Sequence, residues 1–335
     1  MGNNISNRIS CLDQWRGLAL IYVIINHGFK HTGYVEGLGR SGVNLFFLIS
    51  GLLTFISLKS LARREKNYFI LLPVKRAWRI IPTLLIYTCL TILINGMIWG
   101  EYHWDEFFYG FIADSSKPVL VGVGHLWSIA VEMKFYLLSP LIYWLVTRKY
   151  GLLYGIGVLG IFLVGFFLHV LGKLDIIDSS GILGAACTSK YIFHVSVWPM
   201  MVGFMLGLPY WSKPFSSLIV IFDRYKTSIF WLLQVLVILT AVLVKEAFAT
   251  SAIALLIFPV LIVGFYGNIS FENKYSDVLT YLGKRTYSIY LVQQLLTVDL
   301  SLGGTTYRPI GAVLAIFIGC LFYETIEKKF LRPII

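Results

Sequence analysis

The sequence predicts an all-α integral membrane protein with about ten transmembrane helices and with both termini in the cytoplasm. Of the 335 residues, 57% are hydrophobic and only 13% are charged, whereas soluble domains usually carry about 25% charged residues. The mean hydropathy is +0.76. Because no long polar stretch remains that could fold separately, residues 1–335 are interpreted as a single transmembrane domain without an appended soluble domain.

The apolar runs define the elements that we expect. Each run is close to the ~20 residues that a helix needs to cross a bilayer. In chain order, the predicted spans are 13–31, 41–58, 80–99, 126–146, 151–171, 191–208, 228–244, 247–266, 286–302 and 310–327.

The charge distribution sets the predicted orientation. With the N-terminus inside, nearly all the excess of basic residues falls on segments assigned to the cytoplasm, and the link 59–79 alone carries seven Lys or Arg and one Glu. Cytoplasmic loops of membrane proteins are enriched in Lys and Arg. The formal net charge of +11 is therefore explained by topology, and no nucleic-acid partner is expected.

The four cysteines share no short spacing. They stand at positions 11, 89, 187 and 320, whereas metal sites and disulfide frameworks have closely spaced cysteines. We therefore expect no metal cofactor.

The first predicted span contains two ionisable side chains, Arg16 and His27. Eleven residues of helix bring them to nearly one face, roughly 16 Å apart along the axis. Charged groups inside a membrane are costly and usually face a cavity or a partner. His27 could act as a general base and Arg16 could bind phosphate or carbonyl groups. Pairing of Arg16 with Asp13, three residues earlier, is the structural alternative.

A second polar stripe follows the start of the span 126–146. Its members recur at helical spacing and so share one face; they are His125, Ser128, Glu132 and Tyr136. Glu132 lies about two turns deep, where a lone carboxylate would be costly. We expect it to have a partner, with His27 and Arg16 as the candidates.

Three other stretches carry weaker signals. Arg76 and Arg79 share a helix face at the membrane edge, which suits either a phosphate site or attraction to the membrane surface. The small residues of 42–51 favour close helix packing. Tyr287 and Tyr290 share a face in the span 286–302, either as part of a cavity lining or as interfacial anchors.

Taken together, these motifs resemble the membrane acyltransferase 3 family over nearly the whole chain. The resemblance rests on five motifs that occur in order, at Arg16–His27, Gly42–Gly51, Arg76–Pro82, His125–Tyr136 and Tyr287–Leu291. One departure is that the family often has a histidine shortly after the last motif, where this chain has Gln293 and Gln294.

The resemblance implies an acyltransferase of the bacterial inner membrane. It would move an acetyl group from cytoplasmic acetyl-CoA to a hydroxyl of an extracytoplasmic polysaccharide or lipid-linked glycan, with lipopolysaccharide O-antigen as the first expectation. His27 would be the base or acyl carrier, Glu132 would orient it, and Arg16 would stabilise the oxyanion. The cofactor phosphates would contact basic side chains at the cytoplasmic edge, namely Arg63, Arg64, Lys75, Arg76 and Arg79.

The alternative is a transporter or permease for a glycan or acyl compound. In that case Arg16, His27 and Glu132 would form a substrate or proton relay. Transporters often contain internal repeats, and the apolar runs show no repeat, so the acyltransferase interpretation is favoured.

Overall fold

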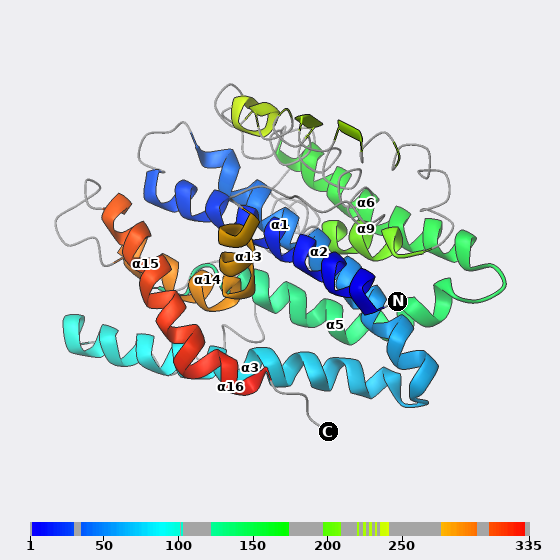
Figure 1. Cartoon of the computed structure of the whole chain (residues 1–335), viewed down its shortest axis with the longest axis horizontal. Helices are drawn as coiled ribbons and strands as arrows, with labels where there is room; N and C mark the ends of the chain where they lie inside the picture. The colour runs from blue at the N-terminus through cyan, green and yellow to red at the C-terminus, as the bar shows by residue number, and fades with distance from the viewer. Residues whose placement is uncertain are drawn as a thin grey trace.

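The computed structural model describes the part of the chain that holds most of the motifs (Figure 1). The described residues are 2–29, 35–100, 102, 122–173, 197–208, 220, 224–225, 228–229, 232, 235–240, 276–299 and 308–331. Every regular element named in these ranges is a helix, which confirms the all-α prediction for them.

The main helices are α1 (Gly2–Phe29), α2 (Glu36–Arg64), α3 (Tyr68–Trp99), α5 (Trp127–Val146), α6 (Gly151–Lys173) and α9 (Trp198–Leu206). Towards the C-terminus follow α13 (Ser276–Lys284), α14 (Thr286–Gln294), η2 (Leu295–Asp299), α15 (Arg308–Phe322), η4 (Tyr323–Glu327) and α16 (Lys328–Phe330).

Four stretches within the described residues are long and apolar enough to cross a membrane. They are Gly37–Arg64, Tyr68–Ile98, Trp127–Val146 and Arg308–Phe330, and they contain or closely match the predicted spans 41–58, 80–99, 126–146 and 310–327. The total of ten spans and the cytoplasmic termini remain predictions, and the span 247–266 lies outside the described residues.

The basic link 59–79 differs from the expected connection between spans. Apart from the residues between Arg64 and Tyr68, it belongs to α2 and α3. The reason is that Lys and Arg are good helix formers, so the helix continues where the hydropathy signal ends. Arg79 therefore lies in the middle of a 32-residue helix.

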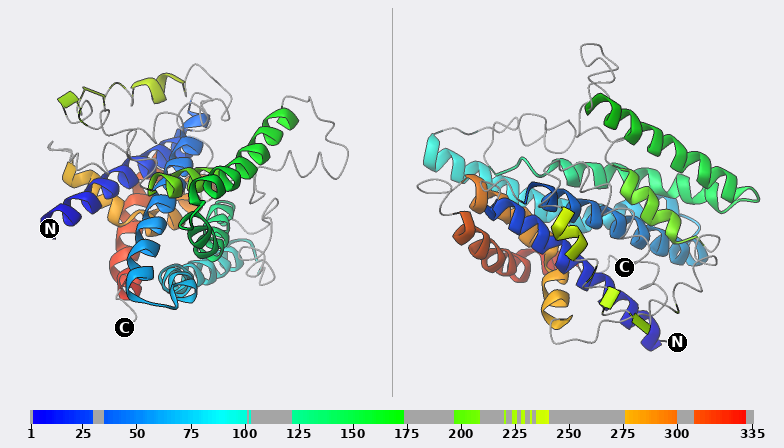
Figure 2. Two further views of the ribbon diagram at one scale, coloured as in Figure 1. Left: turned by 90° about the vertical axis from the view of Figure 1, so that its right-hand side faces the viewer. Right: turned by 90° about the horizontal axis from the view of Figure 1, so that it is seen from above.

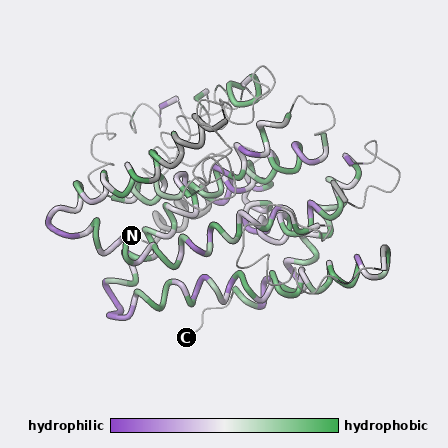
Figure 3. Tube along the Cα trace, turned by 180° about the vertical axis from the view of Figure 1, so that it is seen from behind, coloured by the Kyte–Doolittle hydropathy of each residue, from purple (hydrophilic) through white to green (hydrophobic). Residues whose placement is uncertain are grey.

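The turn between α2 and α3 and the turn between α5 and α6 lie at the same end of the bundle (Figure 1). The hydropathy trace shows hydrophilic residues at both turns and long hydrophobic runs along the helices between them (Figure 3). This arrangement agrees with an alternation of membrane spans, whereas the side that faces the cytoplasm remains a prediction.

Close backbone contacts join α1 to α2 and α2 to α9. A Cβ atom added at Gly42 would lie 2.5 Å from the carbonyl oxygen of Ala19. A Cβ at Gly51 would lie 1.9 Å from the carbonyl oxygen of Met200. Such distances are too short for any side chain, so the predicted close packing of the 42–51 stretch is confirmed.

Contacts of the same kind join α1 to α13, two helices far apart in sequence (Figures 1 and 2). A Cβ at Gly17 would lie 2.2 Å from the carbonyl oxygen of Leu279, and a Cβ at Gly283 would lie 1.8 Å from that of Asp13. The two glycines bring the C-terminal end of α13 beside Arg16, and this approach builds one wall of the site.

Two helices continue into π-helical turns. The turn η2 follows α14 directly after Gln294, and η4 follows α15 and ends at Glu327. A π-turn widens the helix and redirects the side chains beside it, and such turns are frequent at functional sites. Both lie next to residues of the site described below.

Candidate active site

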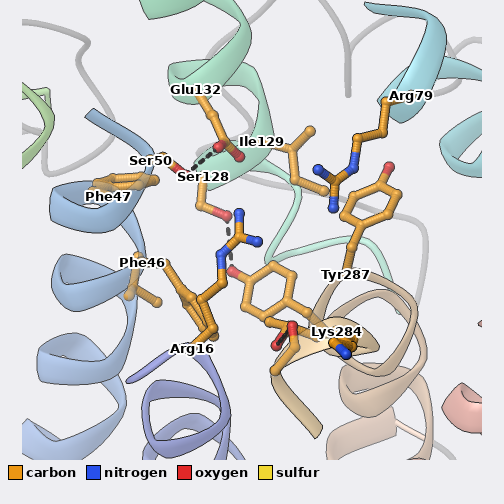
Figure 4. A pocket seen from close by; sticks show the side chains of 14 residues that line it. Arg16, Phe46, Phe47, Ser50, Arg79, Ser128, Ile129, Glu132, Lys284 and Tyr287 are labelled. Atoms are coloured by element: carbon orange, nitrogen blue, oxygen red, sulfur yellow. Dashed lines mark hydrogen bonds between the residues drawn. The ribbon is translucent and has the colours of Figure 1, made fainter. Parts of the chain in front are cut away.

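A cavity lies where α1, α2, α3, α5, α13 and α14 meet (Figure 4). It contains about 610 Å³ of space free of atoms, open solvent included. Its lining comprises Arg16, Val43, Phe46, Phe47, Ser50, Arg79, Ser128, Ile129, Glu132, Gly283, Lys284, Thr286, Tyr287 and Tyr290. Six helices thus bring together residues from all five sequence motifs.

Three cationic side chains and one carboxylate line this cavity. Arg16 comes from α1, Arg79 from α3 and Lys284 from α13, and Glu132 comes from α5. The guanidinium groups of Arg16 and Arg79 lie within electrostatic range of each other, and both point into the space between the helices (Figure 4). An excess of positive charge in a partly apolar space favours an anionic ligand.

Arg16 also has the structural partner that the sequence allowed. Its Nη1 lies 3.7 Å from Oδ1 of Asp13, one turn earlier on α1. The two interpretations of Arg16 are therefore compatible, since the ion pair orients a side chain that still lines the cavity.

Two hydroxyl groups hold the carboxylate of Glu132. The Ser50 hydroxyl donates a hydrogen bond of 2.6 Å to Oε1, and the Tyr136 hydroxyl donates to the same oxygen. The sequence predicts His27 or Arg16 as the partner of Glu132, and the guanidinium of Arg16 does lie within electrostatic range of this carboxylate, although the direct hydrogen bonds come from the two hydroxyls. The guanidinium of Arg76 lies over the aromatic ring of Tyr136, 5.0 Å from the ring centroid.

A hydrogen-bonded group, called the closing group below, forms part of the wall of the cavity. The hydroxyls of Ser128 and Tyr290 lie 2.8 Å apart, and each also lies within hydrogen-bonding distance of the backbone carbonyl oxygen of His125, at 3.0 and 3.3 Å. Because each hydroxyl has one hydrogen, one of them donates to the carbonyl while the other donates to its hydroxyl partner. The ring of His125 is buried and packs edge-on against Tyr290, with ring centroids 5.0 Å apart. The predicted stripe on α5 thus meets the predicted stripe on α14.

His27 does not line the cavity. Its Nδ1 is 2.5 Å from Oε1 of Gln293 on α14. Gln293 is fully buried. Gln293, one of the two glutamines that stand where the family often has a histidine, therefore contacts His27, the residue expected to act as the base or acyl carrier.

The predicted cofactor residues separate into two groups. Arg79 lines the cavity, and Arg76 lies next to it through Tyr136. Arg63, Arg64 and Lys75 are exposed and lie outside the lining, so any contact of theirs with a cofactor remains a prediction. Within the described ranges, no group of three or more His, Cys, Asp or Glu could hold a metal ion.

Sequence reasoning missed Lys284 and Glu327. Lys284 is the last residue of α13, and it reaches the cavity through the packing of α13 on α1, which no local pattern in the sequence indicates. Glu327 was counted only as tail charge, yet its side chain is buried and its Oε2 accepts hydrogen bonds from the Ser288 backbone N–H at 3.2 Å and hydroxyl at 2.5 Å. This carboxylate holds α14, and with it Tyr287 and Tyr290, in place.

Curated relatives match part of the chain. The proteins named O-acetyltransferase OatA from Staphylococcus aureus strains NCTC 8325 / PS 47 and COL are each 29% identical to this chain over 154 residues. The match covers 39% of this chain and 24% of the length of those proteins. No solved structure matches.

The family comparison covers far more of the chain. The sequence model described as an acyltransferase domain matches residues 9–324. That range includes Arg16, Arg79, Glu132, Lys284 and all the other residues that line the cavity. The chain therefore belongs to the acyltransferase 3 family of membrane acyltransferases.

Proposed function

We propose that this protein is a membrane O-acetyltransferase that carries an acetyl group from cytoplasmic acetyl-CoA to a hydroxyl of an extracytoplasmic glycan. One observation carries the proposal: the cavity gathers the cationic side chains of Arg16, Arg79 and Lys284, whereas His27, eleven residues after Arg16 on the same helix, lies outside its lining. Such an arrangement suits a reaction whose donor and acceptor come from opposite sides of a membrane. The bacterial inner membrane is the expected location.

The donor end of the site is the cavity. Acetyl-CoA is an anion with several phosphate groups, and guanidinium groups bind phosphate through paired hydrogen bonds. Arg79 and Lys284 would hold the phosphates. Glu132, fixed by Ser50 and Tyr136, would limit the positive charge and leave room for the thin pantetheine arm.

Arg16 takes a different role from the one first expected. It stands eleven residues before His27 on one helix, roughly 16 Å away along the axis, and its guanidinium lines the cavity. A group at that distance cannot stabilise an oxyanion formed at His27. We therefore assign Arg16 to binding the donor rather than to the reacting carbonyl.

His27 is the proposed base. Its imidazole would take the proton of the acceptor hydroxyl while the hydroxyl oxygen attacks the thioester carbonyl. The tetrahedral intermediate would then collapse, the C–S bond would break, and the thiolate of CoA would receive the proton from the imidazolium. The products are an acetyl ester and free CoA, so atoms and charges balance.

The acceptor is expected to be a polysaccharide or lipid-linked glycan. The S. aureus relatives are named as O-acetyltransferases, which supports an oxygen acceptor. Lipopolysaccharide O-antigen remains the first candidate for the glycan, by the family resemblance.

The test uses purified full-length protein in lipid vesicles with labelled acetyl-CoA and candidate glycans. The expected result is a labelled ester that mild alkali removes, with release of free CoA. Transport of acetyl-CoA or glycan without any ester would refute the proposal and favour a permease. Mass spectrometry of surface glycans with and without the gene would identify the sugar. A well-folded His27→Ala variant with the wild-type rate would exclude His27 as the base.

A further inference from the structure

The contact between His27 and Gln293 joins the N-terminal helix to α14. The two residues are 266 positions apart in the sequence. Nδ1 of His27 lies 2.5 Å from the carboxamide oxygen of Gln293. Gln293 has no exposed surface. A buried polar side chain placed directly against the proposed base calls for an explanation in terms of the reaction.

The chemistry of the carboxamide fixes the state of the ring. A carboxamide oxygen can only accept a hydrogen bond, so Nδ1 of His27 must carry the hydrogen. In a neutral imidazole the lone pair then belongs to Nε2. The contact therefore selects the tautomer whose other nitrogen can accept a proton.

The backbone of Gln293 is also held in place. The Thr297 hydroxyl, in the π-helical turn η2, donates a hydrogen bond of 2.7 Å to the Gln293 carbonyl. Ile289, one turn before Gln293 on α14, is buried against α15, where a Cβ at Gly319 would lie 2.5 Å from its Cα. These contacts give the carboxamide a fixed place beside the histidine.

We propose that Gln293 is a positioning residue for His27, which it holds as the neutral Nδ1–H tautomer whose proton-accepting lone pair is on Nε2. The inference rests on the proposed function, because it assigns a role within the same site. It also explains what a neutral partner achieves here. A carboxylate in the same place would stabilise the imidazolium. As the pH falls, His27 would then become protonated, and so inactive as a base, already at a higher pH.

The decisive variants are Gln293→Glu and Gln293→Leu, with Gln294→Leu as the adjacent control. Gln293→Leu should lower kcat roughly ten- to a hundredfold, because the ring loses its orientation, while KM for acetyl-CoA changes less than about twofold. Gln293→Glu should move the acidic limb of the kcat/KM profile to higher pH by about one unit. Gln294→Leu should leave that limb in place.

Each outcome decides one question. A Gln293→Leu variant with wild-type kcat, or a Gln293→Glu variant with an unshifted acidic limb, would overturn the role of Gln293. The His27→Ala variant separates this failure from failure of the proposed function. If His27→Ala is inactive while both Gln293 variants behave as wild type, only the positioning role is lost. If His27→Ala is fully active, the assignment of the base itself is wrong. Thermal unfolding in detergent should show that the near-isosteric Gln293→Glu variant is folded.

Discussion

Replacing Arg79 by alanine tests whether the cavity binds the phosphates of the donor. Arg79 is half-buried in the wall of the cavity, where it adds one of three cationic side chains. The substitution removes a guanidinium from the cavity and leaves the backbone of α3 unchanged. We expect KM for acetyl-CoA to rise and kcat to change little, because Arg79 lines the cavity whereas His27 lies outside its lining.

The size of the effect follows from the burial of the side chain. A hydrogen bond to a charged group contributes about 1.5–3 kcal/mol, and partial exposure of Arg79 favours the lower part of this range. Since each 1.4 kcal/mol corresponds to a factor of ten, KM should rise roughly ten- to thirtyfold. Arg79→Lys keeps the charge but loses the planar fork, so its effect should be smaller, roughly three- to tenfold.

The assay compares acetyl-CoA with acetyl-pantetheine, which lacks the nucleotide and its phosphates. Arg79→Ala should raise KM for acetyl-CoA and leave KM for acetyl-pantetheine nearly unchanged. Arg148→Ala is the matched control, since Arg148 is exposed and stacks on Trp144 away from the cavity; it should change neither value. An equal increase for both donors would refute phosphate binding by Arg79.

Three other predictions concern packing, the closing group and topology. Gly51→Ala should lower the unfolding temperature in detergent, because its Cβ would lie 1.9 Å from the carbonyl oxygen of Met200 and overpacking costs about 1–3 kcal/mol. The control Gly157→Ala, where nothing lies within 4 Å of the added Cβ, should leave the unfolding temperature unchanged. Equal unfolding temperatures of the two variants would contradict the close packing at Gly51. Tyr290→Phe should cost about 1 kcal/mol of stability through its lost hydrogen bonds, measured by thermal unfolding, whereas an unchanged midpoint would show that the pairing with Ser128 contributes nothing. A reporter that works only in the cytoplasm should be active when it is fused to either terminus, and a reporter that works only outside the membrane should be inactive there. Activity of the second reporter at either terminus would overturn the predicted orientation.

Sequence reasoning could predict the helices and many members of the site because those signals are local. The spacing of Ser128 and Glu132 places them on one face whatever surrounds the helix. The close approach of α2 to its neighbours likewise follows from the small residues Gly42 and Gly51. These inferences needed no knowledge of which helices become neighbours.

The missed features depend on pairings between distant segments. The hydroxyl of Ser50 holds Glu132, 82 positions later, and Gln293 contacts His27 from 266 positions away. No local pattern contains such information. Lys284 joined the cavity only because Gly17 and Gly283 let α1 and α13 touch backbone to backbone. The π-helical turns were missed because hydropathy does not distinguish a π-turn from an α-turn.

The hydrogen bond between Ser128 and Tyr290 has a consequence for the membrane as a whole. An unbroken file of water from Arg79 to His27 would let protons leak down the membrane potential, which is worth about 2.3 kcal/mol per charge at 100 mV. In the described structure this pair and the His125 carbonyl hydrogen-bond to one another, so in this state they leave fewer groups to bind the water of such a file. Opening it means breaking about one net hydrogen bond, worth ~1 kcal/mol. A cost of that size is low enough to yield to an entering acyl chain, so the buried apolar side chains packed around the pair must supply the rest of any barrier to protons.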